Sequence, residues 1–146
     1  MNKIVSWLGK NALYLSFGVA LTATMGSLFF SEIMSLPPCV LCWYQRICIY
    51  PLFPIFMVGI LRKDPKVHWY AWPLIIPGLL ISIFHNLLYW KILPEAAAPC
   101  VAGISCTTKF FEWFGFVTIP FLSLLAFVTL TILMVIYTKR HKINLP

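Results

Sequence analysis

The chain has 146 residues, 61% of them hydrophobic and 10% charged, and its mean hydropathy is +0.89. A soluble domain carries about a quarter charged residues, so this composition excludes an ordinary soluble protein and indicates an integral membrane protein. The net charge of +7 is spread over short segments between apolar stretches. We therefore expect no nucleic-acid partner and interpret the charge as a signal of membrane orientation.

Four apolar stretches are long enough to cross a bilayer, which takes roughly 20 helical residues. The predicted spans are residues 11–31, 43–61, 69–90 and 113–138. The sequence therefore predicts an all-α integral membrane protein. It forms a single four-transmembrane-helix bundle over residues 1–146, with outer loops at 32–42 and 91–112.

The first span carries small residues at Gly18, Thr22 and Gly26, which share one helix face. Small residues at this spacing permit close approach of a neighbouring helix, so we predict a packing face. The apolar region is longer than that of a signal peptide, and no small-residue cleavage site follows it. We expect this span to be retained.

The most informative segment of the chain lies at the outer end of the second span: Cys39-Val40-Leu41-Cys42-Trp43-Tyr44-Gln45-Arg46. Two cysteines at this spacing can close an easily exchanged disulfide or hold a metal ion. An arginine inside a membrane segment is expensive and usually marks a functional site. Together they predict redox chemistry at a membrane surface.

The helix start favours a thiolate at Cys42, because backbone N–H groups and the positive end of the helix dipole stabilise negative charge there. Gln45 and Arg46 follow three and four positions later and share its face, while Cys39 should lie nearer water. The alternative is a purely structural disulfide, with the Arg46 side chain extending to the membrane–water interface. A structural disulfide, however, does not require an arginine. Cys48 lies deeper, on another face, and we expect it to pack as a small apolar residue.

The third span contains a single ionisable residue, His85, about one turn from its outer end. An ionisable residue inside a span is a candidate for function. The alternative is a structural histidine that forms a hydrogen bond with an amide or backbone group. In the following loop, Cys100 and Cys106 are separated by five residues. So short a ring constrains little of the unfolded chain, which favours a disulfide for exchange over a structural staple.

The basic residues predict the orientation of the bundle. Eight cations fall on one side of a four-span topology: Lys3, Lys10, Arg62, Lys63, Lys66, Lys139, Arg140 and Lys142. The positive-inside rule then places both termini in the cytoplasm. The two cysteine pairs fall on the opposite, oxidising side, where disulfides form and persist.

The Cys-Val-Leu-Cys-Trp-Tyr-Gln-Arg motif, the four spans and the second outer cysteine pair together resemble the DsbB/BdbC disulfide-bond formation family. The short spacing from Cys100 to Cys106 and the Trp-Tyr-Gln-Arg ending are more similar to the BdbC branch. The resemblance implies a thiol:quinone oxidoreductase in the bacterial cell membrane. Its active cysteines would face outward and support disulfide formation in exported proteins.

The resemblance also implies an order of thiol exchange. A reduced thioredoxin-fold thiol oxidase similar to DsbA or BdbD would attack the Cys100–Cys106 disulfide at Cys100. Cys106 would then pass the electrons on by exchange with Cys39, which would leave Cys42 as the thiolate in contact with the quinone. Thiolate attack through mixed disulfides is the expected elementary step.

The predicted quinone site contains Cys42 and Arg46, as the resemblance implies. We add Gln45, which shares their helix face, and His85, the ionisable residue of the third span. Arg46 would stabilise negative charge on the thiolate or on a quinone oxygen. The quinone, menaquinone or ubiquinone, would be a diffusible electron acceptor reached through the membrane lipid. The chain has no phosphate loop or dinucleotide fingerprint, which agrees with a diffusible carrier.

Three other functions are compatible with parts of the pattern. A membrane metal-binding or transport protein could use four thiolates, but no further ligand cluster accompanies them in the sequence, and we predict no metal site. A quinone reductase like the vitamin K epoxide reductases would carry its active cysteine pair late in the bundle, and no cysteine follows Cys106. A structural subunit with two staples would not need Arg46.

Overall fold

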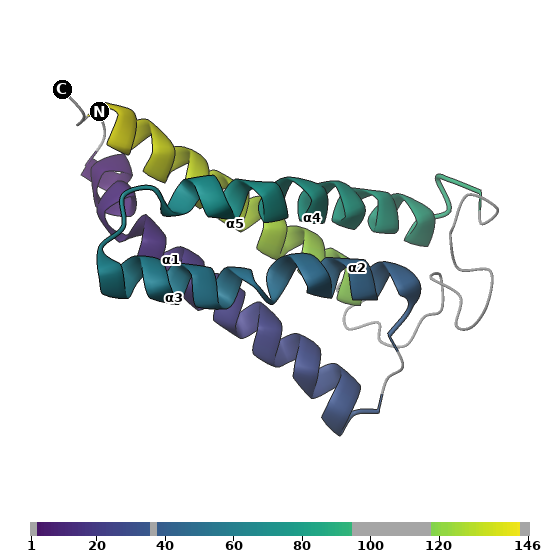
Figure 1. Cartoon of the computed structure of the whole chain (residues 1–146). Coiled ribbons are helices and arrows are strands. Elements are labelled where there is room, and N and C mark those ends of the chain that lie inside the picture. The colour runs from purple at the N-terminus through teal and green to yellow at the C-terminus, as the bar shows by residue number, and fades with distance from the viewer. Residues whose placement is uncertain (1–2, 36–37, 95–117, 144–146) are drawn as a thin grey trace.

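The computed structural model describes residues 3–35, 38–94 and 118–143. Every regular element in this part of the chain is a helix (Figure 1). The elements are α1 (Lys3–Leu28), the π-helical turn η1 (Phe29–Ile33), α2 (Val40–Ile49), α3 (Leu52–Arg62), α4 (Val67–Tyr89) and α5 (Ile119–Ile143). Cys100 and Cys106 lie outside the described residues, as does most of the predicted outer loop 91–112.

Within the described residues, four helical segments are long and apolar enough to cross a membrane. They are Trp7–Ile33, Val40–Arg62, Val67–Tyr89 and Ile119–Arg140. This confirms the predicted all-α class with four membrane-spanning helices. The start of α1, the turn between α3 and α4 and the end of α5 lie at one end of the bundle, and the start of α2 lies at the other (Figure 1).

The second span is divided into two helices where Pro51 interrupts the pattern of backbone hydrogen bonds. Proline has no N–H to donate, so α2 ends at Ile49 and α3 begins at Leu52 with Pro51 as its N-cap. Tyr50 N–H still donates to Arg46 O at 3.0 Å, which keeps the two helices nearly continuous. The site therefore lies at the start of α2, which forms the first half of the span Val40–Arg62.

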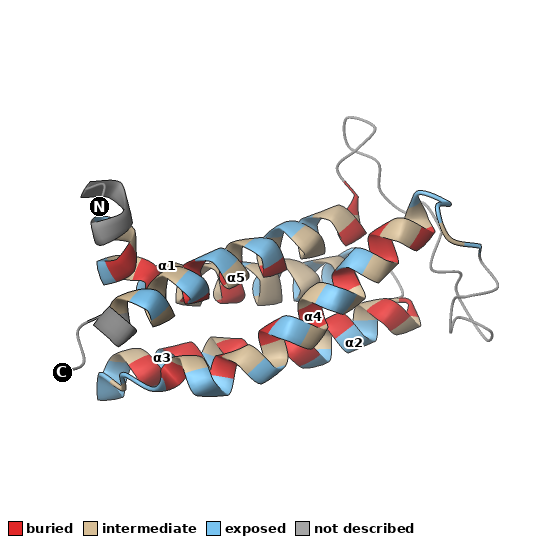
Figure 2. Ribbon diagram, turned by 90° about the horizontal axis from the view of Figure 1, so that it is seen from above, coloured by how far each residue is buried: buried red, intermediate tan, exposed pale blue. Residues whose placement is uncertain are grey.

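The core lies where the inner faces of the helices meet. Figure 2 shows buried and exposed residues alternating around each helix, so that each has an inner and an outer face. Phe56, Ile75 and Phe127 are fully buried in one cluster that joins α3, α4 and α5. A Cβ added at Gly78 of α4 would collide with the Phe127 ring, so glycine permits the close approach of α4 and α5.

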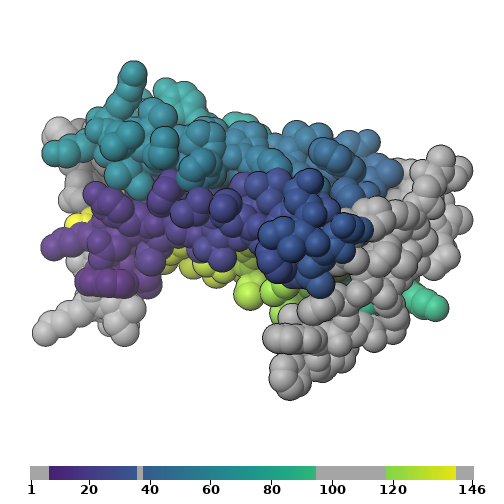
Figure 3. Space-filling model, turned by 90° about the horizontal axis from the view of Figure 1, so that it is seen from below, coloured from purple at the N-terminus to yellow at the C-terminus, as the bar shows by residue number. Residues whose placement is uncertain are grey.

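The small residues of α1 do not form the predicted packing face. A Cβ added at Gly18 or at Gly26 would meet nothing within 4 Å. Both residues, and Thr22 between them, instead line a cavity that α1 shares with α2 and α5. Figure 3 shows α1 crossing one face of the bundle, with α5 along one side of it. The prediction failed because small residues can leave space at a helix interface as well as allow contact.

Candidate functional site

Cys39 is the N-cap of α2. Its backbone is extended, with φ −71° and ψ 169°, and its Sγ accepts a hydrogen bond from the Cys42 N–H at 3.4 Å. A side chain that caps a helix in this way turns back over the first turn. The two thiols are free, and their sulfur atoms lie 3.0 Å apart. Oxidation of the pair would therefore need only a small movement to form a disulfide, whose S–S bond is about 2.05 Å.

The capping position also reverses one expectation from the sequence. Cys39 is only 7% exposed, whereas the Cys42 side chain is half-buried. The prediction that Cys39 lies nearer water is therefore wrong for the side chains. As an N-cap, Cys39 points its sulfur inward over the helix end, toward α4.

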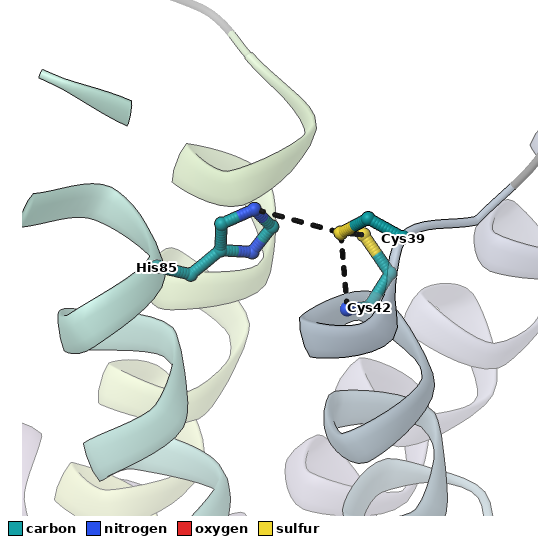
Figure 4. A group of neighbouring side chains, drawn as sticks. All are labelled: Cys39, Cys42 and His85. Atoms are coloured by element: carbon teal, nitrogen blue, oxygen red, sulfur yellow. Dashed lines mark hydrogen bonds between the residues drawn. The ribbon is translucent and has the colours of Figure 1, made fainter. Parts of the chain in front are cut away.

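His85 reaches the thiol pair from α4 (Figure 4). The ring is 1% exposed, and its Nε2 atom lies 3.8 Å from Cys39 Sγ. On the other side, Gln45 Nε2 lies 3.3 Å from His85 Nδ1, and Gln45 is itself buried. If the amide N–H donates to Nδ1, the ring proton is on Nε2 and faces the Cys39 sulfur; the other tautomer, with the amide turned over, reverses both roles. The ring is therefore paired with an amide, which is one of the two alternatives for His85, and it also lies beside the Cys39 thiol; its functional role stays a prediction.

These neighbours shift negative charge within the reduced pair onto Cys39. A hydrogen bond with the Cys42 thiol lowers the pKa of Cys39 below its ordinary range, and His85 lowers that pKa further, against the opposing effect of burial. The sequence had assigned the thiolate to Cys42 from its place near the helix start. The structure adds a donor, His85, that faces the other sulfur.

Arg46 is held by α1. Its Nε donates to Ser27 Oγ at 2.9 Å, and one terminal nitrogen donates to Ser27 O at 3.1 Å. The Tyr50 hydroxyl donates to the same Ser27 Oγ at 3.2 Å. The guanidinium also lies 5.5 Å from the centre of the Trp43 ring, within the range of a cation–π contact. Ser27 thus fixes the cation, and the sequence analysis missed it because a serine in an apolar span gives little sign of its partner.

One cavity of about 720 Å³ joins these residues. Its polar end contains five of the seven predicted site residues: Cys39, Cys42, Gln45, Arg46 and His85. Its walls come mainly from α1 and α5 and are mostly apolar, including Leu15, Val19, Leu122 and Phe127. Ligand pockets usually have volumes of about 300–1,000 Å³, apolar walls and a few convergent polar groups, and this cavity has each of these properties.

The remaining cysteines divide into two cases. Cys48 is 6% exposed and belongs to the buried cluster that contains Leu52 and Phe56, so it packs away from the thiol pair. Cys100 and Cys106 lie outside the described residues. Their pairing and their approach to Cys39 therefore stay predictions.

The same end of the cavity holds three atoms of the kinds that bind metal ions. Cys39, Cys42 and His85 each offer one ligand atom, and these atoms lie within 4.8 Å of one another. The sequence predicts no metal site because no ligand cluster accompanies the cysteines along the chain. The fold adds a third ligand from α4.

Comparisons with known proteins agree on one family. The model of the family "Disulfide bond formation protein DsbB" matches residues 9–137. Disulfide bond formation protein C of Bacillus subtilis is 47% identical over 122 residues, which cover 84% of this chain and 88% of that protein. A probable disulfide formation protein of Metapseudomonas resinovorans is 40% identical over 141 residues, covering 96% and 98%. No solved structure matches the chain.

Proposed function

The chain belongs to the DsbB family of disulfide bond formation proteins, and on this premise we propose that it is a membrane thiol:quinone oxidoreductase. Family membership and the four spanning helices make it a multi-pass membrane protein with a disulfide oxidoreductase role. The finer proposal concerns its two substrates. It would reoxidise an extracytoplasmic thioredoxin-fold oxidase and pass the electrons to a quinone in the membrane.

A single observation carries this proposal: two thiols 3.0 Å apart lie at the polar end of a largely apolar cavity of about 720 Å³. A dithiol gives up two electrons and two protons when it closes a disulfide, and a quinone takes up the same number to become a quinol. The apolar walls suit a lipid-soluble ring and the start of its isoprenoid tail. A disulfide that served only as a staple would need no such cavity.

The proposed electron path uses the cysteines in sequence. The partner's dithiol reduces the Cys100–Cys106 disulfide through a mixed disulfide at Cys100, and the partner leaves oxidised. Cys106 then attacks Cys39 of the Cys39–Cys42 disulfide, which forms a Cys106–Cys39 mixed disulfide and releases Cys42 as a thiolate. Cys100 next attacks Cys106, which restores the Cys100–Cys106 bond and releases Cys39 as a thiolate. The reduced Cys39–Cys42 pair closes again as two electrons and two protons pass to the quinone through Cys42.

The other polar residues would manage charge during this transfer. The Arg46 guanidinium lines the cavity and can stabilise negative charge on a quinone oxygen. His85 faces Cys39 and can hold or donate a proton at Nε2, with Gln45 fixing the ring. The low dielectric constant of the apolar cavity strengthens each of these interactions.

We further propose that the thiol end of the bundle faces the outside of the cell. The cation-rich turn between α3 and α4 and the end of α5 lie at the other end, and the positive-inside rule assigns that end to the cytoplasm (Figure 1). Labelling of intact cells with a membrane-impermeant maleimide tests this. A new cysteine at Ile92, beyond the end of α4, should be labelled, and one at Lys63 should not.

Steady-state quinone reduction, driven by a reduced thioredoxin-fold oxidase, tests the proposed reaction. Replacement of any one of four cysteines by serine should abolish turnover: Cys39, Cys42, Cys100 and Cys106. The matched control is Cys48→Ser, which should turn over normally because Cys48 packs in the core. Normal activity in the Cys42→Ser variant would refute the proposal, and so would a requirement for Cys48.

A further inference from the structure

The thiol pair and His85 also form a set of three metal-binding atoms, a property that the proposed electron transfer does not use. Cys39 and Cys42 come from α2, His85 comes from α4, and their ligand atoms lie within 4.8 Å of one another (Figure 4). Electron transfer from a dithiol requires only the two sulfur atoms. An imidazole nitrogen at this distance from both completes three positions of a tetrahedron.

The distances fit a small tetrahedral ion. With metal–sulfur bonds of about 2.3 Å and a metal–nitrogen bond of about 2.0 Å, the ligand atoms of such a site lie roughly 3.5–3.8 Å apart. Cys39 Sγ already lies 3.8 Å from His85 Nε2. The two sulfur atoms, now 3.0 Å apart, need to separate by less than about 1 Å. Rotation of the half-buried Cys42 side chain can supply this.

The charges fit as well. Two thiolates and a neutral imidazole around a divalent cation give a neutral cluster. A neutral cluster avoids the large desolvation cost of an isolated charge, which matters where Cys39 is 7% exposed and His85 is 1% exposed. Thiolate and imidazole ligands select thiophilic ions and disfavour Mg²⁺ and Ca²⁺, which prefer oxygen.

Gln45 supplies the support that a histidine ligand needs. A ligating histidine usually directs its second ring nitrogen to a hydrogen-bond partner, which fixes the tautomer and the ring orientation. Gln45 lies 3.3 Å from His85 Nδ1 and is 6% exposed. If the Gln45 amide is turned by 180°, its oxygen accepts a hydrogen bond from Nδ1–H of His85. The unprotonated Nε2 of His85 then directs its lone pair toward the sulfur atoms.

We propose that the reduced Cys39–Cys42 pair and His85 bind one thiophilic divalent cation of the Zn²⁺ class, with the fourth coordination position open to the cavity. Each thiol loses one proton on binding, and both protons leave to solvent. All three ligand residues line the cavity, so water or a small ligand can occupy the fourth position. Because the bound thiolates cannot form a disulfide, cation binding and electron transfer exclude each other. The proposal needs only the reduced pair and does not depend on which molecule accepts the electrons.

Cobalt binding to the full chain in detergent tests the site. The background variant carries Cys100→Ser and Cys106→Ser, so that the outer loop contributes no thiol. After reduction with a phosphine and anaerobic removal of the reductant, Co²⁺ is added, and the thiolate-to-cobalt charge-transfer absorption is recorded. One equivalent should bind, and one equivalent of Zn²⁺ should displace it.

Three further substitutions locate the ligands. Adding Cys42→Ser should abolish the absorption, and adding His85→Gln should weaken binding at least about tenfold. His68→Gln is the matched control, since His68 lies at the opposite end of α4, and it should leave binding unchanged. Absence of binding by the reduced background would overturn the proposal, as would an affinity that His85→Gln leaves unchanged.

X-ray absorption on the zinc-loaded background protein gives a test that needs no change at His85. The expected first shell contains two sulfur atoms and at least one imidazole nitrogen. A shell without an imidazole nitrogen, or one with three sulfur atoms that include Cys48, would overturn the assignment.

Discussion

The contact between Ser27 and Arg46 gives the sharpest prediction about how the site is held. Ser27→Ala removes the hydroxyl that accepts from Arg46 Nε at 2.9 Å and from the Tyr50 hydroxyl at 3.2 Å. The bond from Arg46 to the backbone oxygen of residue 27, at 3.1 Å, can remain. The guanidinium therefore keeps its hydrogen bond to Ser27 O and loses the bond that fixes its orientation.

The size of the effect on the quinone follows from the lost bond between Arg46 and the Ser27 hydroxyl. A hydrogen bond to a charged group contributes about 1.5–3 kcal/mol, and partial burial together with the surviving tether favours the lower end. A loss of about 1.4 kcal/mol corresponds to a factor of ten in binding. If Arg46 orients the quinone, the KM for quinone should rise about tenfold, while the KM for the partner oxidase stays unchanged.

Steady-state kinetics with each substrate varied in turn measure this separation. Ser27→Thr keeps the hydroxyl and should restore most of the quinone affinity. Ser31→Ala is the matched control, because Ser31 donates to Leu28 O and has no described contact with Arg46. An unchanged KM for quinone in Ser27→Ala, or an equal rise for the partner oxidase, would refute the assignment of Ser27 as a positioning residue.

Two further predictions concern packing and protonation. Gly78→Ala should destabilise the protein by about 1–3 kcal/mol and lower its melting temperature in detergent, since the added methyl group meets the Phe127 ring. Gly18→Ala, with nothing within 4 Å of its Cβ, should melt like the parent, and equal melting of the two variants would contradict this packing. The lowered pKa of Cys39 means that its thiolate persists below the ordinary thiol pKa of about 8.5 and is lost only as the pH falls through the lowered value. Thiolate ultraviolet absorbance in a variant that retains only Cys39 and Cys42 should show this, and His85→Ala should move the transition to higher pH. A transition that stays in place after this substitution would contradict the role of His85.

The number of membrane spans could be predicted because their signal is local. Each span is a stretch that is almost entirely apolar, and its length and composition identify a membrane helix. The same holds for the face that carries Cys42, Gln45 and Arg46, because their spacing fixes their neighbourhood within one helix. All three line the cavity, as that spacing implies.

Contacts between helices could not be predicted in the same way. Ser27 precedes Arg46 by 19 positions, and His85 follows Cys39 by 46, so no helical period relates them. The open space beside Gly18 and Gly26 depends on how α1 crosses α5, which the small residues permit but do not determine. The inward direction of the Cys39 side chain likewise depends on its position as the N-cap of α2 and on its neighbour His85, which comes from α4.

Electron transfer from Cys39 and Cys42 to a quinone can be measured on the isolated thiol pair. The fully reduced Cys100→Ser/Cys106→Ser variant is mixed anaerobically with excess quinone, without a partner oxidase, and the quinol formed per chain is measured. We expect one quinol per chain, loss of this yield when Cys42→Ser is added, and the full yield when Cys48→Ser is added. Quinol formation that persists without Cys42, or that fails in the double variant itself, would contradict electron transfer from this pair.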